Sequence, residues 1–113
     1  MKLDFADYRV TIAIVPVDLR AGYVRLSAIA SCLMNIDVDQ GRDVVVFMSK
    51  NRQLCKVVWS DKYGHTLLNR RLNRGSFQKL LAPAEDPNGM PVTKAEVLRY
   101  LDGQSVQVPR QSF

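Results

Sequence analysis

The sequence has little of the chemistry on which several protein classes depend. It holds two cysteines, Cys32 and Cys55, and a single histidine, His65, in 113 residues. Zinc sites and the disulfide frameworks of small secreted domains need more of these residues at shorter spacing. Both cysteines lie in apolar surroundings, so we expect buried free thiols, no metal and no cofactor.

Long apolar runs are also missing. A membrane-spanning helix needs roughly 18 apolar residues, and the longest run, near residues 11–17, is interrupted by Pro16. Asp4 and Asp7 stand where a secretory signal would carry basic residues. We therefore expect no membrane contact and a cytoplasmic location.

No set of residues predicts catalysis. A metal-dependent nuclease needs several carboxylates that converge on Mg²⁺, but Asp is favoured in turns for its local hydrogen bonds. The candidates are mostly in such turns: Asp18, Asp37, Asp39, Asp43 and Asp61. His65 has no partner fixed by spacing, and a nucleophilic pair with Cys55 is a weaker interpretation than a buried thiol. We expect that the protein is not an enzyme.

Positive charge is abundant and local. The chain carries a net charge of +5, whereas residues 42–79 carry nine cations against two carboxylates, which gives +7. Lysines and arginines on one surface release counterions from a phosphate backbone and so bind DNA. The candidate DNA-binding residues are Lys50, Arg52, Lys56, Lys62, Arg70, Arg71 and Arg74. Tyr63 is the aromatic residue placed to stack on a base, while Phe47 and Trp59 fit a core better.

The same charge allows two other interpretations. A basic sheet face can be no more than solvated surface, or it can dock onto an acidic surface of a protein partner. A binding titration against salt on random duplex DNA separates these interpretations from phosphate contact.

Hydrophobic periodicity predicts one α+β domain. The expected order is a strand, a helix, a three-stranded antiparallel meander and a helix, at residues 8–15, 19–34, 44–48, 54–59, 66–72 and 93–101. Asp18 is placed to cap the first helix, and Thr93 with Glu96 has the spacing of a capping box for the second. We expect a small antiparallel sheet in two layers, with the arginine-bearing face outward.

The whole chain, residues 1–113, is short enough for a single domain. We expect a compact core over about residues 8–103. Prolines and Asn88-Gly89 predict a mobile loop over residues 82–92, and the polar residues 104–113 predict a frayed tail.

Several motifs, in this order, resemble one protein family. They are Pro16-Val17-Asp18-Leu19-Arg20 with Gly22, Phe47 with Asn51-Arg52, Trp59 with Asp61 and Gly64, and Arg71-Leu72 with Gly75 and Phe77. Over residues 8–103 the chain resembles TnpB, the small accessory protein encoded by the second open reading frame of the insertion sequence 66 family of bacterial transposons. The motif residues with expected structural roles are Asp18, Arg20, Trp59, Asp61 and Gly75.

The resemblance implies a role in transposition beside a separate transposase. With the local charge, it leads us to expect a non-catalytic accessory protein that binds DNA through a basic β-sheet face. The alternative is an interaction module that docks onto the transposase or a sister accessory protein without touching DNA. DNA and proteins of the same element are the expected partners, and the sequence predicts no oligomeric state.

Overall fold

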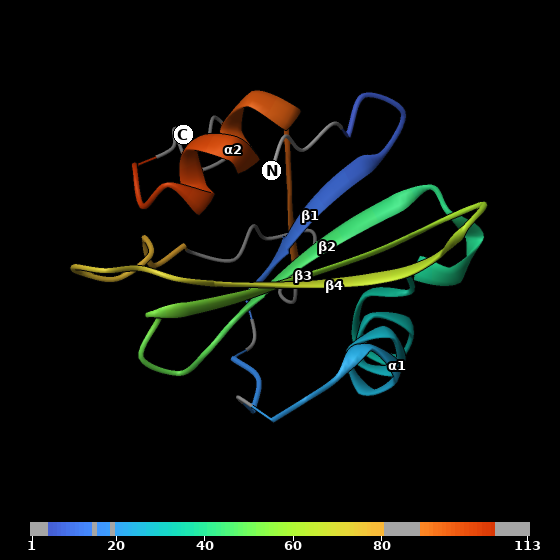
Figure 1. The fold of residues 1–113 in the computed structure, drawn as a ribbon, viewed down its shortest axis with the longest axis horizontal. Helices are drawn as coiled ribbons and strands as arrows, with labels where there is room; N and C mark the ends of the chain where they lie inside the picture. Colours follow the sequence, from blue (N-terminus) through green and yellow to red (C-terminus); the bar gives the residue numbers. More distant parts are fainter. Residues whose placement is uncertain (1–4, 15, 19, 81–88, 106–113) are drawn as a thin grey trace.

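The computed structural model describes residues 5–14, 16–18, 20–80 and 89–105. Its strands are β1 (Arg9–Ala13), β2 (Asp43–Met48), β3 (Leu54–Asp61), β4 (Gly64–Arg71) and β5 (Gly89–Val92). Its helices are α1 (Tyr23–Met34), the short 3-10 helix η1 (Val38–Gln40) and α2 (Lys94–Leu101). The strands form one sheet in the order β4-β3-β2-β1-β5 (Figure 1).

The sheet is mixed. β1 and β2 are parallel, with Val10 opposite Val44, and the other three pairings are antiparallel. The predicted α+β domain is confirmed, but the expectation of a wholly antiparallel sheet is wrong at this pair. The reason is the connection through α1, because a helical crossover returns the chain to the edge of the sheet from which β1 started.

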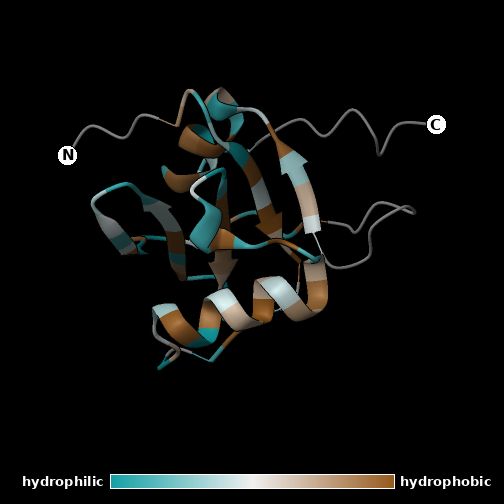
Figure 2. Cartoon of the chain, turned by 90° about the vertical axis from the view of Figure 1, so that its right-hand side faces the viewer, coloured by the Kyte–Doolittle hydropathy of each residue, from teal (hydrophilic) through white to brown (hydrophobic). Residues whose placement is uncertain are grey.

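A helix covers each face of the sheet, so the molecule has three layers instead of the predicted two (Figure 1). On one face Ile12 and Val46 pack in one core with Tyr100 of α2. On the other, Phe47 packs in a second core with Leu26 of α1. Figure 2 shows the longer helix along one side of the strands, whose brown segments lie between the helical layers. All residues of β2 are buried, as expected of a continuous apolar run placed between two layers.

The predicted loop over residues 82–92 ends in a strand that the sequence did not reveal. Residues 89–92 form β5, antiparallel to β1, with Met90 fully buried opposite Ile12. Pro91 is tolerated because β5 is an edge strand. Residues 81–88 and 106–113, which hold the rest of that loop and most of the predicted tail, lie outside the described residues.

The first helix starts later than predicted. Gly22 is the N-cap residue of α1, and the Asp18 carboxylate instead accepts the backbone N–H of Arg20 at 2.7 Å in a turn before the helix. The capping box of α2 is confirmed, with reciprocal hydrogen bonds between Thr93 and Glu96. No helix among the described residues is both long and apolar enough to cross a membrane.

Candidate nucleic-acid interface

The parallel pair creates one special edge of the sheet. The carboxyl ends of β1 and β2 meet there, and ligands of α/β sheets bind preferentially at such ends. The segment after β1 crosses this edge beside the turn after β2: Val17 forms a parallel bridge with Ser49 and donates its N–H to Met48 O at 3.0 Å. The turn before α1 and the β2–β3 turn therefore form one surface.

Three adjoining grooves lie on this surface. The largest, of about 760 Å³, is lined by Val17, Asp18, Arg20, Ser49, Lys50 and Asn51. A groove of about 210 Å³ shares Arg20 and adds Arg25. A third, of about 100 Å³, shares Lys50 and adds Arg52 and Lys79. We call this surface the basic end and define it by its five cations, Arg20, Arg25, Lys50, Arg52 and Lys79.

Asp18 is the one carboxylate among the described residues that line these grooves. A side-chain hydrogen bond from Arg20, with the backbone N–H of the same residue, lowers the pKa of Asp18. The carboxylate is thus ionised at neutral pH and opposes one of the five cations, which leaves a net charge of +4 on the basic end.

The N-terminus of α1 adds to this field. Its first turn holds no acidic residue, and no side chain caps it. The unsatisfied N–H groups of a helix start carry partial positive charge. Arg25 lies within this first turn, so the helix brings both a formal charge and its backbone dipole to the basic end.

Lys56 is not available to phosphate. Its residue exposure is 7%, and its Nζ donates a hydrogen bond to the backbone oxygen of Ala21 at 2.8 Å. The predicted DNA contact is wrong for this residue. The strand period turns Lys56 toward α1, and its ammonium secures the turn that precedes the helix.

The other predicted cations do not share one face with Lys50 and Arg52. Arg70 lies on the α2 face, where its Nε donates to Leu101 O at 2.9 Å and its guanidinium pairs with Asp102 at 3.1 Å. Arg71 follows it in β4 and so points to the α1 face. The expected single basic sheet face is therefore wrong, because successive strand residues alternate faces and a helix covers each.

Two other predicted cations line none of the three grooves. Lys62 is in the β3–β4 turn, at the opposite end of β3 from Arg52, with its ammonium 5.2 Å from the ring centroid of Tyr63. Arg74 is exposed beside Gly75 in the segment that follows β4. Of the seven predicted residues, the grooves bring together Lys50 and Arg52.

Arg52 also has a structural role. It adopts a positive φ of 58°, and its Nε donates to Phe77 O at 3.3 Å. Its backbone oxygen accepts the N–H of Phe77. The aromatic ring of Phe77 is buried against Tyr100, so this arginine links the basic end to the core on the α2 face.

The family-motif residues hold the backbone in place. Trp59 packs edge-on against Phe5 with ring centroids 5.1 Å apart. The Asp61 carboxylate accepts the N–H groups of Tyr63 and Gly64 at 2.8 and 3.1 Å, which closes the β3–β4 turn. Gly75 has φ 73°, a left-handed conformation that favours glycine.

The candidate catalytic residues are not brought together. Cys55 faces the α2 core, whereas His65 lies on the opposite face, stacked on Tyr23 with its Nδ1 3.2 Å from Ser60 Oγ. Among the residues that the structure describes, no three His, Cys, Asp or Glu side chains form a group that could hold a metal. Cys32 is exposed, not buried as predicted, because it lies on the outer side of α1.

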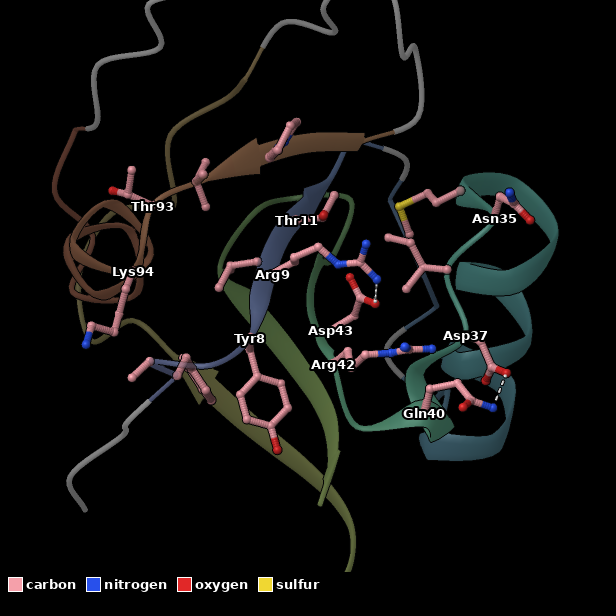
Figure 3. A pocket seen from close by; sticks show the side chains of 17 residues that line it. Tyr8, Arg9, Thr11, Asn35, Asp37, Gln40, Arg42, Asp43, Thr93 and Lys94 are labelled. Carbon is pink, nitrogen blue, oxygen red and sulfur yellow. Dashed lines mark hydrogen bonds and ion pairs between the residues drawn. The ribbon is translucent and has the colours of Figure 1, made fainter. Parts of the chain in front are cut away.

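A second cleft, of about 720 Å³, opens at the other end of β1 and β2 (Figure 3). Arg9 extends across it and pairs with the buried Asp43 at 2.8 Å. Asp37 accepts a hydrogen bond from Gln40 at 3.2 Å on the side of α1. Because charges of both signs line this cleft, it attracts a phosphate group less strongly than the basic end does.

Sequence reasoning did not predict three of the five cations as DNA-binding residues: Arg20 was given a structural role, Lys79 was counted in the basic stretch but not singled out, and Arg25 was not considered. Arg25 lies outside the basic stretch, and Lys79 follows β4 in a segment without regular structure. The sequence did contain one signal, the order strand, helix, strand over residues 9–48. If the two strands had been predicted to be parallel, the start of the helix would have been placed beside the β2–β3 turn.

Comparison with known proteins agrees with the motifs. The sequence model of a protein family described as "IS66 Orf2 like protein" matches residues 8–111. An uncharacterized protein, y4hO, of Sinorhizobium fredii (strain NBRC 101917 / NGR234) is 28% identical over 105 residues, which cover 93% of this chain and 88% of that protein. No solved structure matches the chain.

Proposed function

The chain belongs to the IS66 Orf2-like family of insertion-sequence accessory proteins, and from this membership we propose that it binds DNA through its basic end as a non-catalytic partner in transposition. It acts in the cytoplasm, beside a separate transposase. The observation that carries the proposal is the gathering of five cations and one carboxylate around adjoining grooves at the carboxyl ends of β1 and β2.

The charge of the basic end suits a phosphate backbone. Arg20, Arg25 and Lys50 are exposed and come from two segments that meet only in the folded protein. Each cation that neutralises a phosphate releases a counterion, so affinity falls with salt. Phosphate contacts fix position and carry no sequence information. The proposed binding is therefore independent of DNA sequence.

The test is the salt dependence of binding to a random-sequence duplex. We expect log K to fall linearly with log salt concentration, by about 0.9 in slope for each phosphate neutralised. The double variant Arg25→Gln/Lys50→Gln should lower that slope by about two such steps. The matched control, Arg42→Gln/Arg99→Gln, removes the same charge from exposed residues outside the basic end and should keep the slope.

Two results would overturn the proposal. One is the absence of binding to DNA at low salt. The other is an equal decrease of the salt slope in both double variants, which would show that DNA binding depends on the net charge of the protein and not on the basic end. Incubation of the same samples with Mg²⁺ tests the proposal that the protein is not catalytic. Cleavage of the DNA by the wild-type chain but not by Asp61→Ala would contradict that proposal.

A second candidate, docking onto the transposase without DNA contact, is favoured by the outer side of α1. Val24 is 80% exposed there, and Arg25 is the only charged residue of that helix. Val24→Asp should then abolish binding to the purified transposase of the same element. An unchanged affinity would remove this candidate.

A further inference from the structure

β4 is an edge strand whose outer side pairs with no described residue. It stands last in the sheet and pairs with β3 without interruption over eight residues. The two-residue turn Lys62-Tyr63 makes Asp61 and Gly64 the hydrogen-bonded closing pair. Bonding then alternates, so the backbone groups of four residues point away from β3. They are His65, Leu67, Asn69 and Arg71.

This edge lacks three of the usual protections and keeps one, the charged side chains of Arg70 and Arg71 at its end. Long exposed edges are commonly blocked by proline, bulges or short strand length. The other edge, β5, has four residues and contains Pro91, whereas β4 has eight residues, no proline and an unbroken register. Leu67 and Leu68 are half-buried at its middle. β4 can therefore accept another strand.

Charge along this edge is polarised. At the start of β4, His65 Nδ1 lies 3.8 Å from a carboxylate oxygen of Asp39, and Asp61 precedes the strand. At its end, Arg71 is exposed and forms no ion pair with a described residue. His65 and Arg71 are six residues apart and so share the α1 face. At the start of the edge Asp39 and Asp61 outnumber Lys62 of the turn, so that end is net acidic, whereas the other end is basic.

We propose that β4 pairs antiparallel with β4 of a second copy of this chain. A twofold axis at Leu68 places Leu67 of each copy opposite Asn69 of the other. The outward N–H and C=O groups of the two strands then form hydrogen bonds with each other. Arg71 of each copy then lies opposite His65 of the other, beside Asp39. The contact is self-complementary, as a twofold interface requires, and joins two five-stranded sheets into one.

The charge pattern favours a second copy over a foreign acidic peptide. Such a peptide would satisfy Arg71 but would place its carboxylates against Asp39 and Asp61 at the other end. An antiparallel copy satisfies both ends with the same residues. This inference does not depend on DNA binding.

The experiment measures the mass of the full chain by light scattering and its dimer affinity by sedimentation equilibrium. We expect a dimer. Arg71→Glu should raise the dimer dissociation constant by at least about tenfold, because two attractive contacts become repulsive. Adding Asp39→Arg to that variant should restore the affinity, since the exchanged charges attract again. Asn69→Pro should also weaken the dimer, because it removes an outward N–H.

Arg42→Glu is the matched control. It makes the same charge change on an exposed residue outside β4 and should leave the dimer intact. Circular dichroism and thermal unfolding show whether each variant is folded. A wild-type chain that stays monomeric at all concentrations overturns the proposal. A dimer that tolerates both Arg71→Glu and Asn69→Pro places the interface elsewhere and also overturns it.

Discussion

Lys56 shows how strand alternation decides the role of a single cation. Its ammonium is buried and bonded to Ala21 O. Removing a buried partner costs the desolvation of the group left behind, typically 1–3 kcal/mol. We expect Lys56→Ala to lower the free energy of unfolding by about 1–3 kcal/mol, and Lys56→Met to lower it less because the methionine keeps the apolar stem. Urea denaturation measures both.

The same variants separate a structural role from a DNA-binding one. The salt slope of DNA binding should be unchanged in Lys56→Met, since the ammonium does not reach the surface. A normal stability combined with a reduced slope would contradict the placement of this side chain.

The two thiols should differ in reactivity. Burial raises the pKa of Cys55 to about 12 from its usual 9.0, whereas Cys32 is exposed. The thiolate is the reactive form, so we expect one fast-reacting thiol per native chain at pH 8. The variant Cys32→Ser should have no fast-reacting thiol, and the wild-type chain unfolded in urea should have two. Labelling with a chromogenic disulfide measures this. Two fast thiols in the native chain would contradict the burial of Cys55.

Linkage gives the sign of the pH effect for Cys55. A folded pKa above the unfolded value means that the neutral thiol is favoured in the folded state. Its contribution to stability is complete below pH 9.0 and is lost as the pH rises toward about 12. Alkaline denaturation should therefore begin within this window.

At the scale of elements, α2 depends on its capping box. Thr93 Oγ1 accepts the Glu96 N–H at 3.1 Å, and the Glu96 carboxylate accepts the Thr93 N–H at 2.8 Å. Thr93→Ala should lower the free energy of unfolding by about 1 kcal/mol. Thr93→Ser should lower it much less, because serine keeps the hydroxyl group that caps the helix. Thermal unfolding compares the two. Equal losses would indicate that the threonine methyl group, not the cap, stabilises the helix.

Elements with strong local signals were predicted well, and those set by tertiary contacts were not. The capping box and the apolar runs of β2 and β3 are encoded in neighbouring residues, and both were found. β5 was missed because Pro91 and Gly89 are typical of loops, and only the free edge of β1 makes them a strand. The start of α1 was misplaced because Asp18 is a good cap whose carboxylate the turn uses before the helix begins.

At the scale of the molecule, the sequence predicted the charge but not its arrangement. Counting residues located the excess of cations in 42–79, and Lys50 and Arg52 lie on the basic end. Arg25 joins them only because β1 and β2 are parallel and bring the start of α1 to the same edge. Parallel pairing is a contact between residues about 35 apart in sequence, so it is indicated by the order strand, helix, strand and not by any pattern of neighbouring residues.

The basic end and the β4 edge together make a prediction about the assembly. The carboxyl end of β4 lies beside the β2–β3 turn, since Leu72 donates its N–H to Gln53 O at 3.0 Å. Antiparallel pairing of two β4 strands would therefore direct the two basic ends in opposite directions. A dimer of this kind should hold two duplexes at once, whereas a monomer holds one.

We expect the wild-type chain, loaded on an immobilised duplex, to capture a second, labelled duplex. Arg71→Glu should still bind the immobilised duplex at low salt but capture no second one, while Arg42→Glu, with the same net charge, should capture it. Arg25→Gln/Lys50→Gln should lose both steps together, because its defect precedes assembly. Capture by Arg71→Glu at wild-type level would show that bridging does not need the β4 edge, since this variant changes the edge and leaves all five cations of the basic end in place.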